Sequence, residues 1–382
     1  MISRLHEDDY EKVRSLFKEL EYNLITSAVI EGTSPGRIYV DDTANPQSAF
    51  LCSVEGYYLA GNSENDDFNE SLNSLIMERI FSGYTTRKDE TDVAIGFYPD
   101  TWKDRMKVIF KGRTPIVAHR RHYICRKVRT DWKSRVPTGF SLHLIDGKLL
   151  EELGPNTPRH IADWMEINWG SRQNFLGSGF GFCMLHGEEV VSWSIADCVS
   201  GSLAEIGIRT RPDYRKRGLA SLTAAAAVDY WLSKGSMVGW HCPEENLGSR
   251  GVAEKVGFEL ERKYTQCYAC FNEIHHAAEM AFSHFSGKKY KEALKNLRKV
   301  FSAPKRNLPT WMPERLPAYH HLAAEAWAAL GHNQNAMKLL EMAFAKGWRN
   351  IDSTKKCELF KGLQNKLEWK ELLKKYEQKK DR

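Results

Sequence analysis

The chain has 382 residues, of which 42% are hydrophobic and 27% charged, and its formal net charge is +6. At roughly 150 residues per domain this length predicts two or three domains, and the composition excludes a disordered or fibrous protein. The longest apolar run, residues 222–231, is interrupted by Asp229 and is shorter than the ~18 residues that a membrane helix needs. The first nine residues are too acidic for a signal peptide, and eight cysteines are too few for a disulfide framework. We therefore expect a cytoplasmic protein with reduced thiols and no membrane contact.

The charge is distributed unevenly along the chain. Residues 273–382 hold 22 Lys and Arg against 12 Asp and Glu, a net charge of +10, which leaves residues 1–272 at −4. This shift indicates a domain boundary near residue 272.

In chain order, the first 130 residues mix helical and strand periodicities. Apolar residues at intervals of three and four predict helices over residues 8–21, 69–81 and 101–111. Runs typical of strands cover residues 37–40, 48–59, 92–97 and 122–128, with a turn near Glu55 and Gly56. The mixture favours an α/β or α+β fold, and this part of the chain contains no chemical motif.

The residues that carry chemistry lie between positions 203 and 258. A predicted strand at 203–210 leads through a basic turn into a predicted helix at 219–234, and a second strand at 237–242 precedes a helix at 247–256. Gly218 lets the backbone approach a ligand closely, and Lys216 and Arg217 add positive charge at the N-terminus of the first helix. This combination predicts an anion site, while the alternative is an ordinary strand–helix unit with a basic turn. Asn246 and Gly257 have the residue types that begin and end the second helix.

The last 110 residues read as helices. Residues 277–300 and 322–345 have apolar residues at helical spacing, and small residues repeat in both segments (Ala281, Gly287, Ala293 and Val300; Ala324, Gly331, Ala336 and Ala343). The pattern resembles tetratricopeptide repeats, although the spacing from Ala293 to Ala336 exceeds their period of about 34 residues. Plain helical hairpins are the alternative. The segment lacks a nucleic-acid motif, so we interpret it as a surface for a protein partner, and the charge run at 374–382 as a solvated helix end.

Two motifs between positions 203 and 258 resemble the GNAT N-acetyltransferase superfamily. Arg215, Gly218 and Ala220 match its acyl-CoA signature after a strand, and a downstream motif is matched by Asn246, Ser249, Lys255, Gly257 and Phe258. Residues 192–197, 204–208 and 239–242 are similar to the group that includes zwittermicin A resistance-type acetyltransferases. The resemblance implies a mixed α+β fold of tandem GNAT-like halves with an all-α C-terminal extension. The expected parts are a degenerate GNAT-like half (1–130), a catalytic acetyl-CoA-binding half (131–272) and a basic helical tail (273–382).

The resemblance also implies roles for individual residues in binding acetyl-CoA. The strand backbone at Ile208, Arg209 and Thr210 is expected to bond the pantetheine arm, and Asn246 the pantetheine or the acyl carbonyl. Arg215 is expected to contact the loop or the nucleotide. The residues expected to cradle the pyrophosphate are Lys216, Arg217, Gly218, Leu219, Ala220 and Ser221.

Two residues remain alternatives for the general base. His241 lies five residues before Asn246, where some relatives carry a glutamate base, and Glu205 occupies a strand position where others place one. A histidine titrates near 6.5, which suits deprotonation of an amine. Many relatives have a tyrosine acid where this chain has Ala253, and Ser249 sits where some protein-modifying relatives are thought to use a serine.

Other candidate sites are weaker. Cys267, Cys270, His275 and His276 have the residue types of a zinc site, but Cys267 and Cys270 would point to opposite faces of a strand, so we expect no metal. Cys242 as an acyl-carrying nucleophile is less favoured than Cys242 as a small buried residue.

The sequence thus predicts an acetyl-CoA-dependent N-acetyltransferase that acetylates a primary amine of a small molecule. One alternative acceptor is a protein or peptide amine. A different alternative is a non-catalytic acyl-CoA-binding adaptor that acts through its helical tail.

Overall fold

The protein is described by a computed structural model that covers residues 2–80 and 91–377. Contacts divide the chain into two compact units, Met1–Tyr268 and Ala269–Arg382. Two predictions fall partly outside the described residues: the helix at 69–81, at its last residue, and the charge run at 374–382, at residues 378–382.

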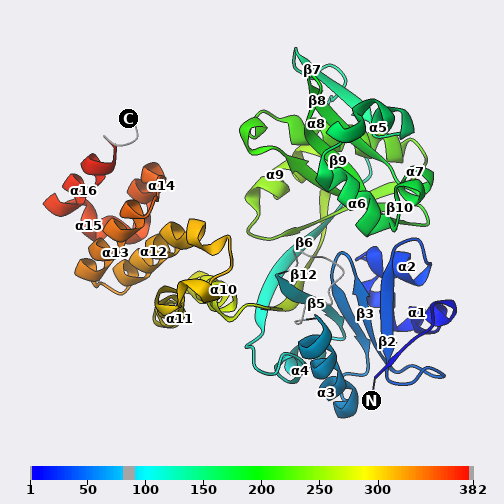
Figure 1. Ribbon diagram of the computed structural model, residues 1–382, viewed down its shortest axis with the longest axis horizontal. Coiled ribbons are helices and arrows are strands. Elements are labelled where there is room, and N and C mark those ends of the chain that lie inside the picture. The colour runs from blue at the N-terminus through cyan, green and yellow to red at the C-terminus, as the bar shows by residue number, and fades with distance from the viewer. Residues whose placement is uncertain (1, 81–90, 378–382) are drawn as a thin grey trace. The chain divides into compact units, whose positions relative to one another are not determined.

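One mixed sheet forms the centre of the first unit (Figure 1). Its twelve described strands lie in the order β1-β2-β3-β4-β5-β12-β6-β11-β10-β9-β8-β7. The strands are β1 (Ser3–Arg4), β2 (Gly36–Val40), β3 (Ser48–Ser53), β4 (Tyr57–Gly61), β5 (Asp92–Tyr98), β6 (Ile116–Cys125), β7 (Phe140–Leu144), β8 (Gly181–His186), β9 (Glu189–Ser200), β10 (Leu203–Thr210), β11 (Met237–Pro243) and β12 (Glu259–Cys270). The mixed fold predicted from the sequence is confirmed.

Two strands are exchanged within this sheet. β6 lies in the predicted first half of the chain, but it pairs antiparallel with β11 and β12, which belong to the second half. β12 in turn lies between β6 and β5 of the first half. The two halves therefore share one hydrogen-bonded sheet. The division of this unit into two GNAT-like halves at residue 130 stays a prediction.

Helices cover both faces of the sheet. Ser192 and Trp193 are neighbours on β9 and so point to opposite faces. The Ser192 hydroxyl lies 3.4 Å from the hydroxyl of Thr223 on α8, whereas the Trp193 ring stacks at 3.7 Å on His160 of α6. The helices of this unit are α1 (Arg14–Phe17), α2 (Ile25–Ile30), α3 (Asp66–Ser74), α4 (Trp102–Ile109), α5 (Gly147–Leu153), α6 (Arg159–Trp169), α7 (Arg172–Ser178), α8 (Leu219–Leu232) and α9 (Leu247–Val256). The face under α8 is called the α8 face below, and the opposite one the α6 face.

The predicted helix at residues 8–21 forms in a different way. Its apolar residues Tyr10, Val13, Phe17 and Leu20 are buried as the periodicity predicts. The backbone, however, is largely 3₁₀-helical, at Glu7–Val13 and Lys18–Leu20, with a single turn of α1 between. The 3₁₀ geometry aligns residues three apart, which suits two of the three intervals in this set.

After the end of β12 at Cys270, the elements of the second unit in its described part are helices. They are α10 (Glu273–Ser286), α11 (Tyr290–Ser302), α12 (Met312–Ala329), α13 (Asn333–Ala345), α14 (Ile351–Lys356), α15 (Lys361–Gln364) and α16 (Leu367–Glu377). The small residues Ala281, Ala293, Ala336 and Ala343 are fully buried, as expected where helices approach closely. The all-helical extension is confirmed, while its resemblance to tetratricopeptide repeats stays a prediction.

Gly257 ends α9 in a conformation that other residues rarely adopt, with φ of 124°. A Cβ there would lie 2.4 Å from the carbonyl oxygen of Lys127. We expect Gly257→Ala to lower the free energy of unfolding by about 2 kcal/mol in denaturant titrations. Gly251→Ala is the control, because a Cβ at this helical position meets open space and should change stability by less than about 1 kcal/mol. Equal effects of the two substitutions on the free energy of unfolding would contradict the requirement for glycine at position 257.

Candidate active site

The two central strands β10 and β11 part at the middle of the sheet. They pair in parallel only from Leu203 to Glu205 on β10 and from Met237 to Gly239 on β11. Beyond Glu205, β10 continues to Thr210 with pairing to β9 alone, after an irregularity between Glu205 and Ile206. The backbone of Ile208, Arg209 and Thr210, predicted to bind pantetheine, therefore has one edge without a partner strand among the described residues. Such an edge can pair with an extended ligand.

The predicted phosphate loop leads into the N-terminus of α8. Lys216 and Gly218 both have positive φ, 61° and 83°, and Gly218 is the N-cap of α8 without a side-chain cap. The first N–H groups of the helix, which start at Leu219, are thus left for a ligand. A Cβ on Gly218 would lie 3.9 Å from Lys255 Nζ, so this lysine of α9 is next to the loop. The geometry fits an anion such as a pyrophosphate.

The arginines of this segment bond to the protein itself. Arg215 Nε donates to the Thr210 carbonyl at 3.2 Å, and Arg217 donates to the Asp213 carbonyl at 3.2 Å. Arg211 pairs with Glu189 and Asp213. Lys216, which is exposed, and Lys255 form no ion pair within the described residues and are the cations best placed for phosphates.

The two candidate bases lie side by side on the α6 face. His241 Nε2 is 2.9 Å from Glu205 Oε1, and Glu205 is only 7% exposed. The Leu24 N–H donates to the same oxygen at 2.9 Å, and the Tyr22 carbonyl lies 3.1 Å from His241 Nε2. Burial by itself would raise the pKa of Glu205, but its interaction with His241, together with the hydrogen bond from the Leu24 N–H, holds this pKa below its usual value. The alternatives left open by the sequence are therefore two members of one pair.

Three further side chains surround this pair, and the sequence did not single them out. His122 of β6 stacks on His241 at 4.4 Å with an interplanar angle of 10°, and Tyr264 Oη lies 2.9 Å from His241 Nδ1. Arg120 Nε donates to Tyr264 Oη at 2.9 Å. Burial, and then the neighbouring His241, lower the pKa of His122 to about 3, so His122 is neutral. Burial also raises the pKa of Tyr264.

His122, Glu205 and His241 are residue types that bind metals. Their ligand atoms lie within 4.8 Å of one another, and they are the group of this kind found among the described residues. His241 and Glu205 already form hydrogen bonds with each other and with neighbouring groups, and these bonds explain why the three side chains lie close together. In the cysteine cluster weighed from the sequence, Cys270 instead donates its N–H to His276 Nδ1 at 3.2 Å.

Ser249 and Asn246 lie on the other side of the sheet. Asn246 Oδ1 accepts from the Ser249 N–H and caps α9. The Ser249 hydroxyl accepts from Trp240 Nε1 at 3.0 Å. Trp240 precedes His241 on β11 and points to the opposite face, so Ser249 is not brought together with the pair. Cys242 is buried, and burial raises the pKa of its thiol, which does not suit a nucleophile.

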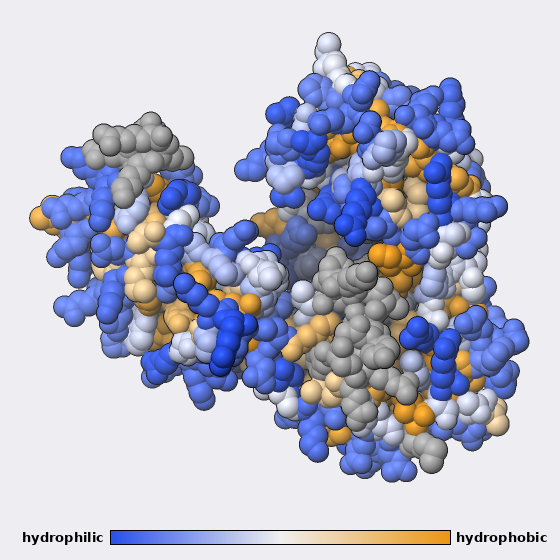
Figure 2. Space-filling view, viewed as in Figure 1, coloured by the Kyte–Doolittle hydropathy of each residue, from blue (hydrophilic) through white to orange (hydrophobic). Residues whose placement is uncertain are grey.

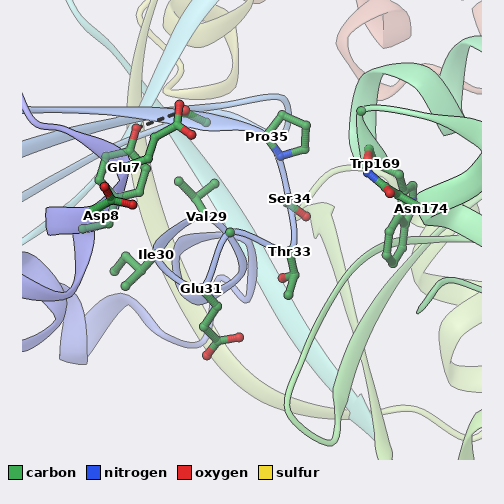
Figure 3. A pocket seen from close by; sticks show the side chains of 14 residues that line it. Glu7, Asp8, Val29, Ile30, Glu31, Thr33, Ser34, Pro35, Trp169 and Asn174 are labelled. Atoms are coloured by element: carbon green, nitrogen blue, oxygen red, sulfur yellow. Dashed lines mark hydrogen bonds between the residues drawn. The ribbon is translucent and has the colours of Figure 1, made fainter. Parts of the chain in front are cut away.

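A separate cavity of about 500 Å³ lies between the N-terminal turn, the α2–β2 connection and the α6–α7 turn (Figure 3). Glu31, Thr33 and Ser34 line one part of it, and Trp169 and Asn174 another. None of the predicted site residues contributes to its wall.

Residues 14–267 match the sequence profile of the GNAT acetyltransferase family, which is well over half of the chain, and the chain belongs to this family. It is an acyltransferase, and proteins of this family use acetyl-CoA as co-substrate.

Two relatives show how much of the chain is shared. An uncharacterized N-acetyltransferase, YdfB of Bacillus subtilis (strain 168), is 27% identical over 271 residues, which is 70% of this chain and 99% of YdfB. The crystal structure of a GCN5-related N-acetyltransferase-like protein from Streptococcus suis 89/1591 is also 27% identical, with a TM-score of 0.51, over 69% of this chain and 98% of that one. The family match ends at residue 267, before the helical unit. No described helix is both long and apolar enough to span a bilayer.

The phosphate loop gives a direct prediction for the co-substrate. Gly218→Asp places a carboxylate where the phosphates are expected, so we expect the affinity for CoA to fall at least about tenfold in calorimetric titrations. Gly201→Asp is the control, since Gly201 also has positive φ and a Cβ there meets open space. Unchanged CoA affinity in Gly218→Asp would contradict the loop assignment.

Proposed function

We propose that the protein transfers the acetyl group of acetyl-CoA to a primary amine of a small molecule, with Glu205 as the general base. The observation that carries the proposal is the position of the Glu205–His241 pair, at the residue where β10 and β11 separate. The open β10 edge at Ile208–Thr210 would hold the pantetheine, and residues 216–221 with Lys255 would hold the pyrophosphate. Acetyl-CoA supplies the thioester that the amine attacks.

The residues of the chain have separable tasks in this reaction. The acceptor arrives as an ammonium ion and must lose a proton before its nitrogen can bond to the acyl carbon. Glu205 accepts this proton, while His241 Nε2 and the Leu24 N–H hold its carboxylate in place. As the nitrogen–carbon bond forms, the carbon–sulfur bond breaks and the thiolate takes up a proton. Ser249, on the α8 face beside Trp240, is our candidate for the donor of that proton.

The walls around Glu205 support a small acceptor rather than a protein segment. The backbone of Tyr22 and Leu24 lies over the pair from the N-terminal part of the chain. On the neighbouring side, a Cβ on Gly207 would lie 2.7 Å from the Trp164 ring, so the ring rests directly on the strand. A bulky peptide loop would have to displace these groups to reach Glu205.

The base assignment gives a kinetic prediction. Glu205→Gln keeps the shape of the side chain and removes its basicity, so kcat should fall by roughly 10²-fold or more with little change in the KM for acetyl-CoA. The measurement is thiol release from acetyl-CoA with a panel of small amines and with lysine-containing peptides as acceptors. Glu188→Gln, in the exposed β8–β9 turn, is the matched control. Full activity of Glu205→Gln would exclude this base, and turnover with peptides alone would favour the protein-amine alternative.

The helical unit supports a second proposal, contact with an acidic protein partner. Residues 288–306 contain eight Lys and Arg and one acid, Glu292. All eight cations are exposed, and none forms an ion pair with another described residue. The visible face of this unit is mostly hydrophilic (Figure 2). Uncompensated charge of one sign favours a partner of the opposite sign.

Charge reversal tests this surface in the full-length protein. We expect wild type to bind a fluorescent poly-glutamate peptide and the variant with Lys291, Lys295 and Lys299 changed to Glu to lose at least about tenfold in affinity by anisotropy. Thiol release should be equal in the two proteins. Equal peptide affinity would contradict the surface, and CoA binding without turnover for any amine would favour the adaptor alternative.

A further inference from the structure

Three hydrogen bonds lead in series from Arg120 to the Glu205 carboxylate. Arg120 Nε lies 2.9 Å from Tyr264 Oη, and Tyr264 Oη lies 2.9 Å from His241 Nδ1. His241 Nε2 completes the series at 2.9 Å from Glu205 Oε1. The members come from four adjacent strands, β12, β6, β11 and β10, at the centre of the sheet (Figure 1).

The chemistry of the end groups fixes the direction of the two outer bonds of this series. A guanidinium group can only donate, so Tyr264 Oη accepts from Arg120, and its own proton can be donated to His241 Nδ1. On the other side of the ring, the Glu205 carboxylate and the Tyr22 carbonyl can only accept, so Nε2 must carry a proton. A His241 ring with its proton on Nε2 and an acceptor at Nδ1 satisfies all of these contacts.

We infer that Tyr264, held by Arg120, is a positioning residue that fixes this tautomer of His241 and so reserves the task of the base for Glu205. With Nε2 already protonated and Nδ1 occupied by the tyrosine hydroxyl, His241 has no position that can take the proton of the acceptor. It donates to Glu205 instead and orients the carboxylate. This inference rests on the proposed function, in which Glu205 accepts that proton.

Among the described residues, the Tyr264 hydroxyl is the hydrogen-bond partner of His241 Nδ1. A proton on Nδ1 would have to be donated to Tyr264 Oη, and the hydroxyl proton of Tyr264 would then lose Nδ1 as its acceptor. The groups that face the ring are Glu205, Tyr264, Tyr22, the neutral His122 stacked on it and, over the Tyr22 ring, Arg262. Glu205 and the Tyr22 carbonyl favour a positive charge, and both already face the Nε2 proton.

The N-terminal half takes part in this arrangement. Arg120 and His122 come from the exchanged strand β6, and Tyr22 and Leu24 supply the backbone groups that cover the pair. The half that the sequence suggests is degenerate therefore completes the site of the other half.

The resting protein provides a test that does not depend on turnover. In full-length protein labelled with ¹⁵N-histidine, and with His241 assigned by the His241→Gln variant, the imidazole nitrogens report their protonation directly. We expect a protonated Nε2 and an unprotonated Nδ1 at neutral pH. A ring protonated on Nδ1, alone or together with Nε2, would overturn the inference even if the enzyme acetylates amines.

Removal of the tyrosine hydroxyl tests the consequence. In Tyr264→Phe, Nδ1 loses its donor and can take up a proton, so its resonance should move toward the protonated range at a pH where wild type is unchanged. We expect kcat to fall roughly tenfold, part of the 10²–10⁴ that a positioned base contributes, with an unchanged KM for acetyl-CoA. Tyr123→Phe removes another buried hydroxyl of the same sheet, one that bonds Glu254 rather than the pair, and serves as the control. An unchanged Nδ1 resonance with kcat equal to that of Tyr123→Phe would overturn the positioning role.

Discussion

The backbone pairing of β6 with β11 and β12 is the interaction on which the site depends. It joins the two halves into one sheet, and it places Arg120 and His122 opposite the strand that carries His241. Because a one-residue slip in a strand turns every side chain to the other face, the register His122 to His241 must be maintained for the stacked rings and the tyrosine bond to form. Stability of the sheet and chemistry at its centre thus rest on the same hydrogen bonds.

The parting of β10 from β11 provides the complementary feature. Where the pairing stops, β10 offers free backbone groups along one edge, and the loop that follows it ends at the uncapped N-terminus of α8. The carboxylate of Glu205 stands at the start of this opening on the α6 face, and Ser249 lies on the α8 face. In the proposed reaction the opening therefore separates a side with the phosphate-binding groups from a side with the base.

Local signals made part of this arrangement predictable from the sequence. The strand at 203–210 and the helix at 247–256 form with the expected bounds, because Asn246 caps the helix and Gly257 ends it. Gly218 was also recognisable from a local signal, since it lies in a basic turn between a predicted strand and a predicted helix. The roles of Tyr264 and Arg120 could not be predicted, because they depend on which strands become neighbours. No local sequence pattern indicates that β6 pairs across the two halves. His241 and Glu205 stayed alternatives because the relative register of β10 and β11 is set by the fold.

Amide hydrogen exchange with and without CoA measures the central claim most directly, namely that the open β10 edge and the start of α8 hold the co-substrate beside Glu205. The account predicts that saturating CoA slows exchange at residues 206–210 and 218–221 at least about tenfold, while the paired strands β2 and β3 exchange as before. Binding of CoA with unchanged exchange in both segments would contradict it.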